Sequence, residues 1–165
     1  MSYDLIFKPK NDDFTLDKFE AYLKRKAVYS LNKKVNELNA VYENKSTGVN
    51  FNFDYKLDSE SGIRSVLFSL NHLKPSYFAK EADIELKRLV ERFDLIVEDP
   101  QMNGIAGEVY NSAEFINAWT HANEQACQIA AQNKHQLLSL SPEKIESVWQ
   151  WNKNKDSVQS SMAYD

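Results

Sequence analysis

Two strand-like runs joined by a short polar loop constrain the fold of this chain most. In the second run, over residues 49–55, hydrophobic side chains alternate with Asn50, Asn52 and Asp54. This period of two is typical of a strand with one face on a core and the other in water. Because the loop closes at Gly48, the sequence predicts a β-hairpin over residues 41–55.

The remaining hydrophobic patterns predict an α+β fold. Further strands are expected at 3–8, 63–71 and 93–98, and helices at 15–26, 77–92, 111–138 and 142–152. Residues 27–38 fit neither period and are predicted as a loop with at most a short strand. This order favours a two-layer sandwich: a mainly antiparallel sheet of about five strands with helices packed on it. Residues 1–152 are expected to form a single domain, and 153–165 a polar, mobile tail.

Composition and charge limit the classes of partner. The net charge of −4 argues against non-specific nucleic-acid binding and is compatible with a basic protein partner. The N-terminal residues lack the continuous apolar run of a signal peptide or a membrane anchor, so neither is expected. The single cysteine, Cys127, cannot form an intrachain disulfide, which favours a reducing, cytoplasmic location. The oligomeric state is left open.

Candidate catalytic residues are few. His121 and Glu124 are spaced to share one face of the predicted helix 111–138, but His72 and His135 stand at no metal-binding spacing from them. Glu98 and Asp99 end a predicted strand, where charged residues are typical of turns. The sequence therefore predicts no catalytic residues, no metal and no cofactor.

Tryptophans and acidic residues are the stronger candidates for binding. Trp119 lies in an apolar stripe, which predicts a core position. Side chains two apart on a helix diverge by about 200°, so Trp149 and Trp151 cannot share a face. One of them is therefore expected to be exposed or to cover a neighbouring groove, and Trp149 is expected on the inward face of the helix. Trp151 is the candidate partner contact, and packing of the last helix on the body is the alternative. Carboxylates on loops and polar helix faces are expected to be solvated, and some are expected to steer a basic partner: Glu81, Asp83 and Glu85 on a helix, and Asp58, Glu60, Glu98 and Asp99 at strand ends.

Several strings in the first 130 residues resemble a group of small bacterial proteins. The similarity rests on the opening MSYDLIF, on YEN and TGV followed by FNFDY in the hairpin, and on DPQ and WTHANE further along. Several proteins of this group are regarded as immunity proteins against toxins of type VI or contact-dependent secretion systems. The resemblance implies a binding protein, and it assigns no role to a matched residue.

The leading hypothesis is therefore a non-catalytic immunity protein that occludes the active site of a cognate toxin. The expected partner-binding residues are Asp58, Glu60, Glu98, Asp99 and Trp151. One alternative is a small hydrolase-like enzyme that uses His121 and Glu124. The other is an adaptor or chaperone that holds a secretion substrate through residues 141–165.

Overall fold

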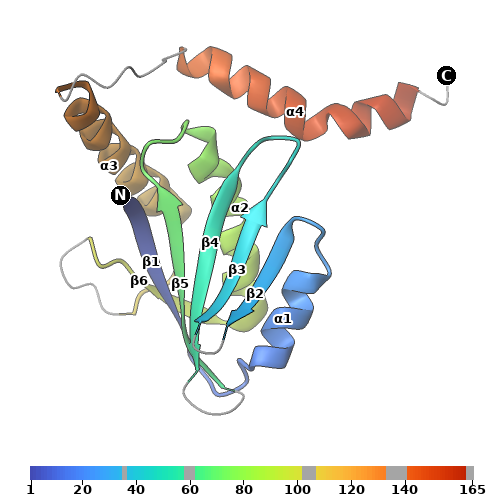
Figure 1. Cartoon of the computed structure of the whole chain (residues 1–165), viewed down its shortest axis with the longest axis vertical. Helices are drawn as coiled ribbons and strands as arrows, with labels where there is room; N and C mark the ends of the chain where they lie inside the picture. The colour runs from blue at the N-terminus through green and yellow to red at the C-terminus, as the bar shows by residue number, and fades with distance from the viewer. Residues whose placement is uncertain (35–36, 58–61, 102–106, 133–140, 163–165) are drawn as a thin grey trace.

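One antiparallel sheet and four helices make up the described part of the computed structural model, which comprises residues 1–34, 37–57, 62–101, 107–132 and 141–162 (Figure 1). The sheet has six strands in the order β2-β3-β4-β5-β1-β6. They are β1 (Ser2–Pro9), β2 (Tyr29–Lys34), β3 (Glu37–Glu43), β4 (Asn50–Leu57), β5 (Ile63–Asn71) and β6 (Leu95–Glu98). The helices are α1 (Leu16–Lys24), α2 (Tyr77–Phe93), α3 (Ser112–Gln132) and α4 (Pro142–Met162). The predicted α+β class and its mainly antiparallel sheet are confirmed.

The sixth strand, β2, lies in the segment that the sequence predicted as a loop with a possible short strand. It pairs with β3 from Tyr29, opposite Tyr42, to Lys34, opposite Glu37. As an edge strand it has only half-buried side chains at Tyr29 and Leu31, so its hydrophobic alternation is weak. Pairing with β3 decides its structure where the local pattern does not.

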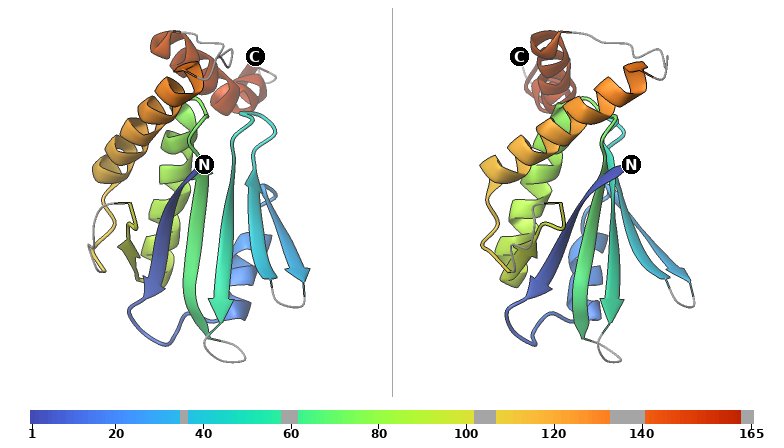
Figure 2. Two further views of the ribbon diagram at one scale, coloured as in Figure 1. Left: turned by 60° about the vertical axis from the view of Figure 1, so that its left-hand side comes forward. Right: turned by 90° about the vertical axis from the view of Figure 1, so that its left-hand side faces the viewer.

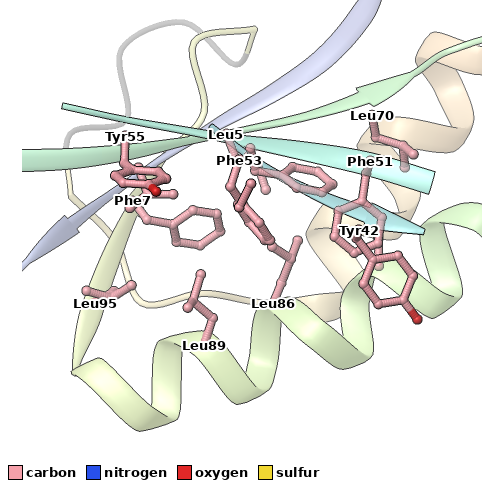
Figure 3. Close-up of a cluster of buried hydrophobic side chains, with 14 of the residues drawn as sticks. Leu5, Phe7, Tyr42, Phe51, Phe53, Tyr55, Leu70, Leu86, Leu89 and Leu95 are labelled. Atoms are coloured by element: carbon pink, nitrogen blue, oxygen red, sulfur yellow. The ribbon is translucent and has the colours of Figure 1, made fainter. Parts of the chain in front are cut away.

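Alternate side chains of the central strands build the core on one face of the sheet. Figure 3 shows Leu5, Phe53 and neighbouring side chains pointing towards Leu86 and Leu89 of α2. Helices α1, α2 and α3 lie on this face (Figure 2), while the opposite face carries exposed residues such as Asn52. The hairpin pattern thus predicted correctly which face is buried.

Local capping explains where two helices begin. The Thr15 hydroxyl accepts a hydrogen bond from the Lys18 amide at the start of α1. The Asn111 side chain accepts bonds from the amides of residues 113 and 114 at the start of α3. Helix α2 includes Phe93, which the sequence also placed in the last strand; it ends because Asp94 adopts a left-handed conformation with φ of 50°.

Helix α4 crosses the end of the molecule near the β3–β4 hairpin and the first turns of α2 (Figures 1 and 2). It extends to Met162, so residues 153–162, predicted as a polar tail, are helical. Residues 143–162 contain neither Gly nor Pro, and nothing local therefore stops the helix after its first residue. No helix within the described ranges is both long and apolar enough to cross a membrane.

The sheet face that carries the core can be tested with two neighbouring residues of β5. Phe68 is fully buried, whereas Leu67 lies on the opposite face and is half-buried. We expect Phe68→Ala to lower the free energy of unfolding by about 3–5 kcal/mol, because it leaves a cavity. Leu67→Ala should cost about 1 kcal/mol or less. Urea unfolding measures both, and equal losses would contradict the assigned inner face.

Candidate functional site

Three carboxylates of α2 are buried rather than solvated, which corrects the sequence prediction. Glu81, Asp83 and Glu85 are each about 5% exposed or less. Each accepts a hydrogen bond from a tyrosine hydroxyl: Tyr42 to Glu81 at 2.7 Å, Tyr110 to Asp83 at 2.8 Å and Tyr29 to Glu85 at 2.9 Å. Helical periodicity placed these acids on a polar face, but the tyrosines that cover this face come from distant segments.

Glu81 joins three parts of the structure through four hydrogen bonds. Its Oε1 accepts from Tyr42 Oη, from Asn44 Nδ2 at 2.8 Å and from Thr47 Oγ1 at 3.0 Å, all in or beside the β3–β4 hairpin. Its Oε2 accepts from Trp149 Nε1 of α4 at 2.8 Å. A buried carboxylate is costly unless its oxygens are bonded, so these four donors act together.

Helix α4 is held on the body by one side. Trp149 is 4% exposed, and its ring stacks on Tyr77 with centroids 6.0 Å apart and planes 16° apart. Lys80 and Glu146 add an ion pair at 2.6 Å. The orientation of α4 about its own axis is thereby fixed, and the opposite side of the helix faces outward.

The outward side of α4 carries an apolar patch that we call the α4 patch, made of Val148 and Trp151. Val148 is 54% exposed and Trp151 62%. At 100° per residue, Lys144 and Lys155 fall on the same side, so the patch has a lysine towards each end. The prediction that one of the two tryptophans is exposed is confirmed, and Trp119 is buried as expected.

The two acids at the end of β6 have different partners. Glu98 forms an ion pair with Lys8 at 2.6 Å. Asp99 accepts hydrogen bonds from the Tyr3 hydroxyl and from both the amide and the side chain of Gln101. Burial, and then the bond to Asp99, raise the pKa of Tyr3, so Tyr3 stays a neutral donor.

Asp99 also lines a small cavity of about 50 Å³ between β6, residues 108–111 and α3. Residue 108 is brought there by a backbone bridge, because the amides of Val97 and Glu108 each bond the other's carbonyl at 2.9 and 3.0 Å. Gly107 makes this approach possible: its φ is +64°, and a Cβ there would stand 3.0 Å from Ile96 Cδ1.

The predicted site residues do not form one cluster. Asp58 and Glu60 lie outside the described residues. The α4 patch is carried by a helix that contacts α2 and the hairpin, whereas Glu98 and Asp99 lie at the far edge of the sheet, beyond β1. The structure therefore presents two separate surfaces rather than a single acidic patch around Trp151.

The two residues of the hydrolase alternative line neither of the two hollows described in this part of the chain. His121 and Glu124 are exposed on α3, and His121 Nε2 lies 2.9 Å from the Gln125 side chain. Neither residue lines the cavity beside β6 or the larger groove of about 270 Å³ between α1 and the end of α2. No group of three or more metal-ligating side chains occurs among the described residues.

Sequence reasoning missed the burial of Glu81 and the place of Glu108. It placed Trp149 on the inward face of the last helix, as observed, but it also placed Val148 there, and Val148 is exposed. Glu81 was indistinguishable from a solvated acid because its donors are up to 68 residues away in sequence. Glu108 follows Gly107, and a glycine in a loop does not by itself indicate a bridge. No protein-family model, curated protein or solved structure matches the chain.

The anchoring of α4 predicts that substitution of Trp149 destabilises the protein and that substitution of Trp151 does not. Trp149→Phe keeps an aromatic ring but removes the donor to Glu81, so we expect a loss of about 1–3 kcal/mol in the free energy of unfolding. Hydrogen exchange of the α4 amides should also speed up. Trp151→Phe is the matched control and should change stability by less than about 0.5 kcal/mol. Equal effects of the two substitutions would contradict the anchoring.

The surroundings of Glu85 predict that the free energy of unfolding depends on pH. Burial raises the pKa of its carboxyl, but hydrogen bonds from Lys26, Tyr29 and Arg88 outweigh this and hold the pKa below its usual value. Its contribution to stability is therefore complete above the unfolded pKa of about 4.3 and is lost as the pH falls through the lower folded value. Glu85→Gln should destabilise the protein near neutral pH, and the difference should shrink as the pH falls below the unfolded pKa. Denaturant unfolding across this range measures it, and a constant difference would overturn the assignment.

Proposed function

We propose that this protein is an immunity-type inhibitor that binds a cognate bacterial effector toxin in the cytoplasm and occludes its active site. The observation that carries the proposal is the exposed indole of Trp151 on a helix fixed in place by Trp149. Tryptophan is enriched among the residues that dominate binding energy at protein interfaces. The resemblance of the first 130 residues to immunity proteins supports the same function.

The way α4 is held favours tight binding. An apolar anchor on a mobile segment loses conformational entropy when a partner orders it, whereas an anchor on a fixed helix does not. Trp149 and the Lys80–Glu146 pair hold α4 before any partner arrives. Val148, beside Trp151, widens the apolar contact, and lysines at both ends add charge for orientation.

An adaptor or chaperone for a secretion substrate would use the same helix. The two functions differ in consequence: an inhibitor suppresses the lethality of its partner, and an adaptor does not. Growth of cells that express the candidate effector encoded beside this gene, with and without this protein, separates them. Survival only in the presence of this protein supports inhibition, and complex formation without protection supports the adaptor.

Trp151→Ala tests the α4 patch directly. We expect the affinity for the effector to fall by about 30-fold or more, corresponding to a loss of about 2 kcal/mol, because the central apolar anchor is removed. Ile129→Ala is the control, since it removes another exposed apolar side chain that belongs to α3 and not to α4. Calorimetric titration with inactivated effector measures both. Unchanged affinity of Trp151→Ala would refute the role of the patch, and wild-type protein that does not bind would refute the function.

A further inference from the structure

The negative charge of the chain is concentrated in one segment. Residues 93–133 contain six carboxylates and no Lys or Arg, whereas the whole chain has 24 acidic and 20 basic residues. The segment therefore carries −6, and the rest of the chain, with 18 acidic and 20 basic residues, carries +2. Because this segment folds into β6 and α3, the charge is gathered on one side of the fold.

Two of these six carboxylates are neutralised within the chain, and three of the other four line the cavity beside β6. Lys10 pairs with Asp94 at 2.8 Å, and Lys8 with Glu98. The carboxylates that line the cavity are Asp99, Glu108 and Glu114. Within the described ranges, none of these three has a Lys, Arg or His partner.

The walls of the cavity are mainly apolar. They include Leu5, Val97, Phe115 and Ala118, and Val109 stands beside them, 76% exposed. A volume of about 50 Å³ is well below the roughly 150 Å³ of a cavity that admits a benzene ring. The cavity is therefore suited to the end of one narrow aliphatic chain and not to an aromatic ring.

Two of the three carboxylates have hydrogen-bond donors within the chain, and the third, Glu108, is exposed on a backbone that is held in place. Tyr3 and Gln101 hold Asp99, and the backbone bridge to Val97 holds residue 108. Glu114 accepts a hydrogen bond from the Asn111 side chain at 3.4 Å in the first turn of α3. Acceptors that are partly held in place beside an apolar cavity lose less conformational entropy on binding a cation than unrestrained side chains would.

We propose that this cavity receives a lysine or arginine side chain of the partner protein. The aliphatic stem of that side chain packs against the apolar walls, while its cation lies among Asp99, Glu108 and Glu114. The inference rests on the proposed function, since the partner is the effector. It adds a second contact surface, distinct from the α4 patch, and names the chemistry that this surface recognises.

Blocked tripeptides test the cavity without an identified partner. The full chain is titrated with Ala-Lys-Ala, Ala-Arg-Ala, Ala-norleucine-Ala and Ala-Glu-Ala while its amide signals are followed by NMR. The lysine and arginine peptides should shift the amides of residues 108–118 in a saturable manner that weakens in about 0.5 M salt. The norleucine and glutamate peptides should not. Equal shifts with norleucine, or no shift in residues 108–118, would overturn the inference.

Charge-neutral variants locate the binding. Glu108→Gln and Glu114→Gln should each weaken the lysine peptide by about threefold, because each removes one carboxylate beside the cation. Glu124→Gln is the matched control: Glu124 is exposed on α3 and does not line the cavity. An equal loss in all three variants would refute a specific site. If the peptides do not bind but this protein still protects cells from the effector, the cavity proposal fails and the proposed function stands. If the peptides bind but cells are not protected, only the proposed function is refuted.

Discussion

The buried carboxylates of α2 are the constraint on which the arrangement of helices depends. An ionised carboxylate removed from water is destabilising unless donors surround it, so each of these acids requires a partner at a defined place. The hydroxyls of Tyr29 and Tyr42 reach α2 from the sheet, and that of Tyr110 reaches it from the segment before α3. These bonds fix the rotation of α2 about its axis. The hydrophobic contacts of Leu86 and Leu89 alone would define that rotation less specifically.

Glu81 extends this constraint to the surface. Its second oxygen accepts a hydrogen bond from Trp149. Because Trp149 is buried, the side chain of Trp151, two positions later on the helix, points outward. The exposure of Trp151 is thus a consequence of the same buried hydrogen-bond network that holds the hairpin on α2. A binding surface built in this way is rigid because the core is rigid. The proposed inhibitory function and the stability of the fold are coupled through one side chain.

The sequence predicted the fold well where one periodicity dominates. The alternation over residues 49–55 and the spacing of α2 identified the inner face, and Thr15 and Asn111 marked helix starts correctly. It left residues 27–38 as a loop with a possible short strand and so did not assign β2, whose structure depends on pairing with β3. At the candidate site, the divergence of Trp149 and Trp151 was predictable from helix geometry. The burial of Glu81 was not, because its donors Tyr42 and Trp149 come from opposite directions along the chain.

Hydrogen exchange of the full chain, alone and bound to the inactivated effector encoded beside its gene, tests the binding surface most directly. The fixed α4 patch and the acidic cavity predict added protection in residues 142–155 and 108–118, with the outer face of β3, β4 and β5 unchanged. Protection confined to that outer face, or none in α4, would contradict a function carried by Trp151.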